Sequence, residues 1–406
     1  MNVKTGISDI NLYTSTFCID TEVLEQKREI SRKMIQESGF ISRSVIPPWE
    51  DSVTLAVNAA KPVVERVSPE HIGLVIVATE SGLDFGKPIS TYVQDQLGIG
   101  PNAKNFEMKH ACYGGTAAVR MALCWVASEE AAGRKALVVC TDIARPHFDN
   151  AAEFTGGSGA VAMIIDKKPA LVEIDPVSGT ASKEIYDVAR PSLTVEWADP
   201  VLSLCCYFDL LEASWLNYCK RHDKEISIRD FNYFLYHTPL LSLIKQSHQI
   251  VLELNDAEDD ENCSFDRMTL PALDYNFRTG NIYSGSVYAA LLGLIYHLSD
   301  EKDPKRVAIF SYGSGACSEL FSATVLPGAA RQLSNQHIME NLKNRCSLSV
   351  EAYEQMAAQC NKNMAAKDYI PPFGELYGKV AEQYKKNHWL VLDNIDTYHR
   401  HYRWEK

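Results

Sequence analysis

The chain of 406 residues lacks several features that would assign it to a class of protein. No run of about 18 apolar residues is free of polar interruption, so we expect no membrane-spanning helix. The first six residues carry no apolar core behind a basic leader, and a secretory signal is not expected. None of the eleven cysteines forms a Cys-x-x-Cys pair, and no phosphate-binding glycine pattern follows a strand in the required place. We therefore expect no disulfide framework and no metal site, and we expect the protein in the cytoplasm.

Positive charge is also in short supply. Lys and Arg number 40 against 52 Asp and Glu, which gives a net charge of −12. This balance argues against non-specific nucleic-acid binding, which depends on neutralising phosphates. Two basic groups remain, at residues 27–33 and 399–403, and each is predicted to be a solvated face.

What the sequence does contain is an alternation of strand and helix patterns. The expected strands are 71–78, 105–108, 136–140, 160–165, 232–236, 306–310 and one that ends at 325. The expected helices are 20–38, 51–67 with a kink at Pro62, 90–97, 116–132, 240–252 and 282–298. This order predicts a mostly parallel sheet covered on both faces. The sequence Gly-Ser-Gly-Ala occurs at 157–160 and again at 313–316, each time before the last strand of a half, which indicates a duplicated α/β unit.

Cys112 is the first candidate for chemistry. It lies just before the long apolar segment 116–132, in which Arg120 is the only charge before residue 129. Such a helix is expected to be buried. The partial positive charge at its N-terminus would favour the thiolate, as a nucleophile requires. The structural alternative is a small buried hydrophobic residue.

Three further polar residues stand at ends of predicted elements. Glu80 follows the strand 71–78 and His237 follows the strand 232–236, whereas Asn281 opens a predicted helix. Active groups of such sheets gather beyond the carboxyl ends of strands, where Asp142 is also expected. Glu80 and His237 are candidate acid/base groups, and Asn281 is a candidate hydrogen-bond donor. The alternatives are an exposed loop residue, a structural histidine and a helix N-cap.

Several motifs together resemble one enzyme family. They are Thr-Glu-Ser-Gly at Glu80, Ala-Cys-Tyr-Gly-Gly-Thr-Ala-Ala at Cys112, Thr-Gly-Gly at 155–157, His-Thr-Pro at 237–239, Gly-Asn-Ile-Tyr at 280–283 and Ser-Tyr-Gly-Ser-Gly at 311–315. Their order resembles that of 3-hydroxy-3-methylglutaryl-CoA synthases. The resemblance implies an α/β, thiolase-like fold with two duplicated halves in a five-layer αβαβα arrangement. We place the N-terminal half at residues 1–166 with Cys112, and the C-terminal half at residues 167–406 with His237 and Asn281.

The resemblance also implies roles for individual residues. Cys112 would carry the acyl group, Glu80 would be the general acid/base and His237 the second acid/base group. The residues expected in the substrate pocket are Asn281, Ser314, Ser203, Thr155 and Tyr113. Asp142 and Asp187 match supporting positions near the site. No metal and no permanently bound cofactor is implied.

Two departures from the mevalonate-pathway members indicate a branch of the family. Ser242 and Gln246 stand where those enzymes carry lysines that meet the phosphates of CoA, and only Lys245 is basic there. The Asn-Ala-Arg-Pro that precedes Thr-Gly-Gly in some members is replaced by Ala-Ala-Glu-Phe at 151–154. A site for the nucleotide of CoA is expected to keep such cations. The chain therefore resembles the branch that works in polyketide synthesis, where acyl groups ride on the phosphopantetheine of acyl carrier proteins.

The resemblance implies a three-stage reaction. Cys112 would take acetyl from a carrier-protein thioester, the enolate formed by Glu80 would attack a carrier-bound β-ketoacyl chain, and water would release the β-branched product. Acyl carrier proteins would be donor and acceptor, and a homodimer is expected. The alternatives are a mevalonate-pathway synthase that uses acetyl-CoA and acetoacetyl-CoA, an initiating ketoacyl synthase that has no need of Glu80, and a catalytically silent partner subunit.

Overall fold

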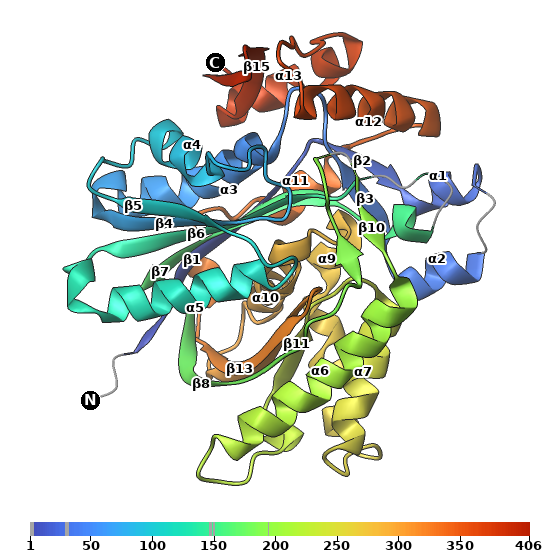
Figure 1. Ribbon diagram of the computed structural model, residues 1–406. Coiled ribbons are helices and arrows are strands. Elements are labelled where there is room, and N and C mark those ends of the chain that lie inside the picture. Colours follow the sequence, from blue (N-terminus) through green and yellow to red (C-terminus); the bar gives the residue numbers. More distant parts are fainter. Residues whose placement is uncertain (1–3, 29–31, 146–147, 149–150, 194) are drawn as a thin grey trace.

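The computed structural model describes residues 4–28, 32–145, 148, 151–193 and 195–406 (Figure 1). Within these ranges nine strands form one hydrogen-bonded sheet. In spatial order they are β11 (Tyr233–Tyr236), β12 (Lys305–Gly313), β13 (Cys317–Val325), β8 (Val172–Ser182), β1 (Thr5–Thr14), β7 (Ser158–Asp166), β6 (Lys135–Ile143), β4 (Ile72–Ala78) and β5 (Lys104–Met108).

The strands fall into two sets with the same pairing pattern. β4 runs parallel to β6 and β6 antiparallel to β7, whereas β11 runs parallel to β12 and β12 antiparallel to β13. The two sets meet at β1 and β8, which pair over three residues only. Both Gly-Ser-Gly-Ala segments lie at the entry into the antiparallel strand, β7 or β13. The pairing thus follows the repeat seen in the sequence, while the boundary at residue 166 stays a prediction.

The expectation of a mostly parallel sheet is wrong. Three of the strand pairs in this sheet are parallel and five are antiparallel among the described residues. The cause is the connection into β7 and β13, which has no crossover helix; only three residues separate β12 from β13.

Helices and sheets alternate in five layers. Leu74 and Ile76 of β4 belong to one apolar cluster and Val75 and Val77 to another, so successive side chains of the strand face opposite layers. The outer layer over β4, β6 and β7 contains α3 (Ser52–Val67). The central layer holds α5 (Gly114–Ala127) and α10 (Ser286–His297), and α6 (Pro200–Lys220) with α7 (Leu241–Glu253) covers the second set of strands (Figure 1). The thiolase-like αβαβα fold is confirmed. Pro62 lies inside α3 without dividing it.

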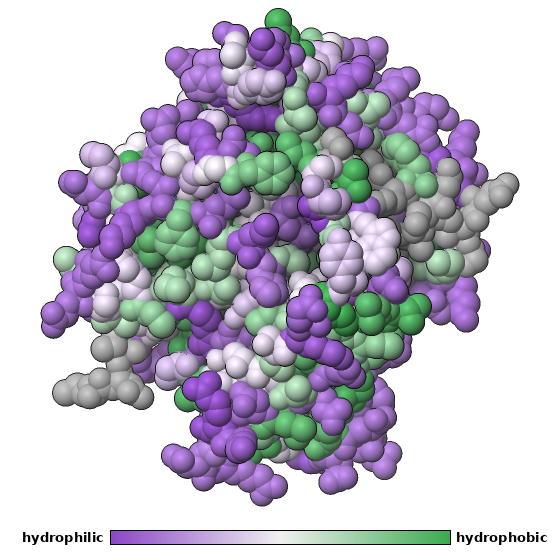
Figure 2. All heavy atoms as spheres, viewed as in Figure 1, coloured by the Kyte–Doolittle hydropathy of each residue, from purple (hydrophilic) through white to green (hydrophobic). Residues whose placement is uncertain are grey.

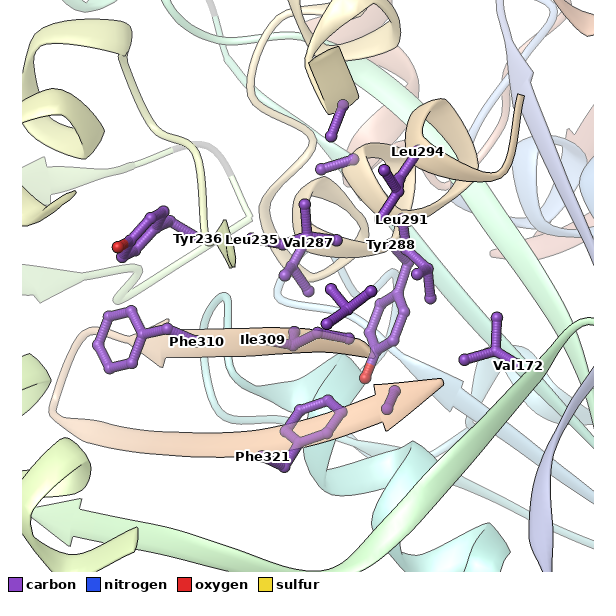
Figure 3. Close-up of a cluster of buried hydrophobic side chains, with 14 of the residues drawn as sticks. Val172, Leu235, Tyr236, Val287, Tyr288, Leu291, Leu294, Ile309, Phe310 and Phe321 are labelled. Atoms are coloured by element: carbon purple, nitrogen blue, oxygen red, sulfur yellow. The ribbon is translucent and has the colours of Figure 1, made fainter. Parts of the chain in front are cut away.

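The two central helices differ in burial. Every residue of α10 from Ser286 to Ile295 is buried, and Figure 3 shows Tyr288 pointing towards Phe321 of β13. The predicted helix 116–132 is α5, but it ends at Ala127, and Met121 and Cys124 on its outer side are exposed. Burial on every side was therefore wrong for α5. The expected helix 282–298 is shorter as well, because α10 begins at Ser286 after the single turn η7 (Tyr283–Gly285).

The remaining elements surround this frame. They are β2 (Phe17–Asp20), α1 (Thr21–Glu25), α2 (Arg32–Ser38), β3 (Ser42–Val45), α4 (Ile89–Gln96), β9 (Val188–Ala189), β10 (Trp197–Ala198), α8 (Phe265–Met268), α9 (Asp274–Thr279), α11 (Ile338–Lys343), β14 (Cys346–Ser347), α12 (Val350–Met364), α13 (Glu375–Asn387), β15 (Leu390–Asp396) and β16 (His399–Trp404). The single helix expected at 20–38 is instead interrupted after Glu25; residues 29–31 lie outside the described ranges. No helix in the described ranges is both long and apolar enough to cross a bilayer.

The C-terminal segment returns to the first half. Asn58 of α3 exchanges two hydrogen bonds with the backbone of Leu390, and Arg400 pairs with Asp51 at 3.0 Å. Arg400 is buried, so the tail 399–403 is not simply a solvated face. Arg28 departs from that expectation too, because it pairs with the buried Glu153 at 3.0 Å. A buried cation needs a carboxylate partner to offset its lost hydration.

Candidate active site

Cys112 lies in the loop between β5 and α5, two residues before the helix begins. Two backbone segments of the second half approach this loop of the first half closely. A Cβ on Gly115 would lie 2.5 Å from the carbonyl oxygen of Ser284, and one on Gly313 would lie 2.5 Å from the backbone nitrogen of Tyr113. Both positions therefore need glycine, and Cys112 sits where the two halves of the fold meet.

Glu80 is in contact with Cys112. Its Oε1 lies 3.5 Å from the Cys112 sulfur, and its side chain is 8% exposed at the end of β4. Burial raises the pKa of Glu80 to about 8; Arg190 opposes this rise, and Asp142 and Glu196 add to it. Burial also raises the pKa of the Cys112 thiol well above its ordinary value, and the nearby carboxylates of Glu80 and Asp142 reinforce that rise. The expected thiolate is therefore disfavoured: desolvation outweighs the helix terminus, and the resting pair is a thiol beside a protonated carboxyl.

Asp142 holds the Glu80 segment in place from β6. Its Oδ1 accepts hydrogen bonds from the Glu80 backbone at 2.9 Å and from the hydroxyls of Ser81 at 3.0 Å and Thr79 at 3.2 Å. Its Oδ2 accepts from the hydroxyl of Ser284 at 2.5 Å and from its backbone nitrogen at 3.2 Å. Five donors thus compensate for the complete burial of this carboxylate. The supporting position predicted for Asp142 agrees with this geometry.

Arg190 approaches Glu80 from the segment after β9. Its Nη1 donates to the backbone carbonyl of Glu80 at 2.9 Å and to Ser81 Oγ at 3.0 Å, and its Nε lies 3.8 Å from Glu80 Oε2. Its Nη2 donates to Glu196 Oε2 at 2.7 Å. The guanidinium carbon lies 5.0 Å from the ring centroid of Tyr283, whose hydroxyl donates to Glu196 Oε1 at 3.0 Å. We call Arg190, Glu196 and Tyr283 the Arg190 cluster.

Hydrogen bonds hold both the side chain and the backbone of Asn281. Its Oδ1 accepts from the backbone nitrogen of Tyr283 at 3.0 Å and from Ser286 Oγ at 2.7 Å, and its own backbone nitrogen donates to the Thr155 carbonyl at 2.7 Å. It lies five residues before α10, so it does not cap that helix. Within the described residues no acceptor takes a hydrogen bond from its Nδ2. The amide is thereby oriented with both N–H donors of Nδ2 available to a ligand.

His237 follows β11 and is 3% exposed. Its backbone nitrogen donates to the Phe310 carbonyl at 2.8 Å, and its carbonyl accepts from the Tyr207 hydroxyl at 2.7 Å. Burial lowers the pKa of His237 to about 3, so the imidazole is neutral at physiological pH. No hydrogen bond joins its ring to another part of the chain that the structure describes, which leaves both ring nitrogens for a ligand.

The other predicted pocket residues are distributed around this centre. Asp187 is buried and accepts from Gly315 N at 2.9 Å and from the Tyr312 hydroxyl at 3.3 Å, which ties it to the turn that carries Ser314. The Tyr113 hydroxyl donates to Glu319 at 2.7 Å and is thus occupied within the protein. Ser203 lies in the first turn of α6. No hydrogen bond in the described ranges joins the side chain of Ser203 or Ser314 to Cys112, Glu80 or His237, and their substrate-binding roles stay predictions.

The sequence analysis did not identify the Arg190 cluster or Ser284. Ser284 stands three residues after Asn281, so a search of that motif for the partner of a buried aspartate could have found it. Arg190 and Glu196 lie about 110 residues from Glu80 along the chain, and nothing in the pattern selects one arginine among 40 basic residues. No group of three or more His, Cys, Asp or Glu side chains suited to a metal ion occurs among the residues described.

A thiolase-like fold in which a cysteine and a carboxyl meet at the centre is that of an acyltransferase that forms carbon–carbon bonds. Comparison with known proteins agrees. The family model described as hydroxymethylglutaryl-coenzyme A synthase N terminal matches residues 2–170, and the C-terminal model matches residues 172–268 and 261–405. The chain belongs to the hydroxymethylglutaryl-CoA synthase family, as its motifs predicted.

Individual relatives are similar over nearly the whole chain. The polyketide biosynthesis 3-hydroxy-3-methylglutaryl-ACP synthase PksG of Bacillus subtilis is 32% identical, with 99% of each chain covered. The HMG synthase of the curacin pathway, crystallised with its donor acyl carrier protein, is 34% identical with a TM-score of 0.93, covering 99% of this chain and all of that one. MvaS in complex with 3-hydroxy-3-methylglutaryl-CoA is 28% identical with a TM-score of 0.88, with both chains fully covered.

Proposed function

We propose that the protein is a β-branching synthase of polyketide biosynthesis, which condenses acetyl from an acetyl-acyl carrier protein with a carrier-bound β-ketoacyl thioester. The relatives support this branch. PksG is named an ACP synthase, and the curacin enzyme binds a donor carrier protein. Both are more similar to this chain than is MvaS, which was crystallised with a CoA thioester.

The observation that carries the proposal is the charge of a hollow next to Thr155. It has an empty volume of about 470 Å³ and lies between α2, the segment around Thr155 and the start of α7. Its lining within the described residues consists of Met34, Glu37, Ser38, Phe154, Thr155, Leu240 and Ser242.

This lining contains one carboxylate and no cation. Ser242 occupies one of the positions where the resemblance leads us to expect a lysine, and the nearby Lys33 is 3.7 Å from Glu37, which offsets its charge. The other expected lysine position, Gln246, is bonded to the Ser242 carbonyl at 3.2 Å. Lys245 lies on the exposed side with its Nζ 5.7 Å from the Phe265 ring centroid. A hollow of this kind suits a phosphopantetheine arm better than the additional phosphates of CoA.

The site supports a three-stage reaction. The Cys112 sulfur attacks the donor thioester carbonyl, and the carrier thiol leaves with the displaced proton. Glu80, in its ionised form, removes a proton from the methyl group of acetyl-Cys112. The enolate carbon then bonds to the β-carbonyl carbon of the acceptor. His237 or the Asn281 amide stabilises the oxygen by hydrogen bonding. His237 passes a proton to the alkoxide and takes up the proton that Glu80 removed, so that both groups return to their starting forms. Water hydrolyses the enzyme thioester and restores the Cys112 thiol, which leaves a β-hydroxy-β-carboxymethyl thioester on the acceptor carrier.

Intact-protein mass spectrometry tests this assignment. Incubation with acetyl-carrier protein is expected to add one acetyl group, which Cys112→Ala eliminates. Acetyl-CoA is expected to load more slowly at the same concentration. No adduct from either donor would refute Cys112 as nucleophile, and equal loading from both would refute the carrier-protein preference. Rapid turnover of free acetoacetyl-CoA would instead establish the mevalonate-type alternative.

We also infer a homodimer in the cytoplasm. Figure 2 shows hydrophobic side chains over the first turns of α6, where Val201 is 72% and Leu202 37% exposed, and Met121 on α5 is 51% exposed. Exposed apolar surface of this kind indicates a protein interface. Light scattering is expected to give twice the chain mass, and Met121→Glu to shift it towards the monomer; an unchanged mass in Met121→Glu and Val201→Glu would place the interface elsewhere. None of the eleven cysteines, all within the described ranges, is in a disulfide.

A further inference from the structure

Glu80 has to change its charge during the proposed reaction. It must be ionised to accept a methyl proton, yet it lies at a position where burial favours the protonated form. The charged or titratable groups that face it are Cys112, Asp142 of β6, Arg190 and Glu196 of the segment around β9 and β10, and Tyr283 of η7. Among the described residues only Arg190 forms a salt bridge with Glu80.

The Arg190 guanidinium interacts with two carboxylates, those of Glu80 and Glu196. Its Nη2 makes a short hydrogen bond of 2.7 Å to Glu196, whereas its Nε is 3.8 Å from Glu80 Oε2 and makes no hydrogen bond within the described residues. Both the arginine and Glu196 have side chains that are 11% exposed, so solvent screens their charges only in part. The Arg190 charge available to Glu80 thus depends on how strongly Glu196 neutralises it.

We propose that Arg190 is a positioning residue that stabilises the ionised form of Glu80, and that Glu196 limits this stabilisation. The inference rests on the proposed acid/base role of Glu80. Arg190 fixes the Glu80 backbone through Nη1 and directs Nε towards its carboxylate. Glu196 holds Arg190 in this orientation and opposes its charge, so Glu80 can both take up and release a proton near neutral pH.

Tyr283 connects the other two residues of the Arg190 cluster to the side-chain amide of Asn281. Its ring lies against Arg190 and its hydroxyl is bonded to Glu196, while its backbone nitrogen donates to Asn281 Oδ1. Its φ of 47° is in the left-handed region, which is unfavourable for a tyrosine and is maintained by these contacts. The base and the carbonyl-binding amide are therefore oriented by one group of side chains.

The test uses exchange of the acetyl methyl hydrogens. The enzyme is loaded from acetyl-carrier protein in deuterated buffer, and deuterium uptake into acetyl-Cys112 is followed against pH in the absence of an acceptor. Removal of the cation in Arg190→Met is expected to move the acid limb of this profile up by about one pH unit or more. Removal of the opposing charge in Glu196→Gln is expected to move the limb down by about half a unit. Arg190→Lys should keep most of the wild-type profile.

Controls separate this inference from the proposed function. Glu184→Gln removes the same charge from an exposed position of the preceding loop and is expected to leave the profile unchanged. If Glu80→Gln retains full exchange, the acid/base role of Glu80 is wrong. If Glu80→Gln abolishes exchange but Arg190→Met and Glu196→Gln leave the limb in place or move it in the same direction, only the Arg190 proposal is wrong. Urea unfolding of each variant establishes that it is folded, and Glu196→Gln retains a decisive outcome should Arg190→Met fail to fold.

Discussion

The two halves place different chemistry at equivalent positions. Glu80 follows β4, which pairs with β6, and His237 follows β11, which pairs in the same parallel manner with β12. Glu80 lies among Asp142, Arg190 and Glu196. His237 instead lies beside the ring of Tyr207, and its backbone nitrogen donates to the carbonyl of Phe310. Burial raises the pKa of Glu80 to about 8 and lowers that of His237 to about 3. One duplicated framework thus keeps both acid/base groups neutral at rest, but only Glu80 is surrounded by charges that can return it to the ionised form, and Arg190 and Glu196 among them come from the second half.

The largest expected effect separates the two groups by reaction stage. Glu80→Gln should still accept acetyl on Cys112 but lose methyl deuterium exchange and condensation, by about 10²–10⁴-fold. His237→Ala should keep both acetylation and exchange, and lose condensation only, because its group acts on the acceptor oxygen. Mass spectrometry of the acetyl enzyme, with and without acceptor, measures all three stages. Loss of exchange in His237→Ala would contradict this division between the halves.

Equivalent positions near the ends of β6 and β12 should contribute differently to the free energy of unfolding. Asp142 lies two residues past the partner of Ala78, and Tyr312 lies two residues past the partner of Tyr236. Asp142→Asn is expected to lower the free energy of unfolding by about 3 kcal/mol, because an amide nitrogen would face hydrogen-bond donors in a fully buried site.

Tyr312→Phe is the matched change in the second half. It loses one hydrogen bond to Asp187, which Gly315 still satisfies in part, and is expected to cost about 1 kcal/mol. Urea denaturation measures both variants. Equal losses would show that the two strand ends carry similar polar networks after all.

The contributions of Glu80 and His237 to the pH dependence of stability should have opposite signs. The folded state keeps a proton on Glu80 that the unfolded chain releases above its ordinary pKa of about 4.5, so Glu80 lowers stability as pH rises from there to about 8. Glu80→Gln is therefore expected to gain about 2 kcal/mol relative to wild type between pH 5 and pH 8.

His237 changes the stability of the folded state in the acid range instead. The unfolded chain takes up a proton below about pH 6.5 that the folded state excludes until about pH 3, so stability is lost as pH falls through this window. His237→Gln is expected to be less sensitive to acid than wild type by about 1 kcal/mol at pH 5. Denaturation at pH 5, 6.5 and 8 with both variants gives the two slopes, and slopes of the same sign would overturn the assigned burial.

The fold and the site residues Glu80, Cys112 and His237 could be predicted from the sequence, but their electrostatic environment could not. Strand periodicity and the apolar segment 116–132 placed Glu80, Cys112 and His237 at ends of elements, because local pattern determines where an element stops. The protonation state of Cys112 was wrong, since it depends on Glu80 and Asp142, which approach from distant segments. Arg190 was missed for the same reason. The C-terminal strands β15 and β16 were not predicted, because nothing local signals that they form a hairpin against α3.

The smallest expected effect concerns the hollow next to Thr155, where α2 from the first half faces α7 from the second. Ser242→Lys would return a cation to a hollow that holds Glu37 and no basic side chain among its described lining residues. The KM for acetoacetyl-CoA is expected to fall about fivefold, and more so at low ionic strength, because one partly exposed ion contact contributes about 1 kcal/mol. Gln249→Lys adds the same charge about 10 Å further along α7 and should leave KM unchanged. Equal effects of the two lysines would mean that general charge steering, and not the lining of the hollow, sets the preference for a carrier arm.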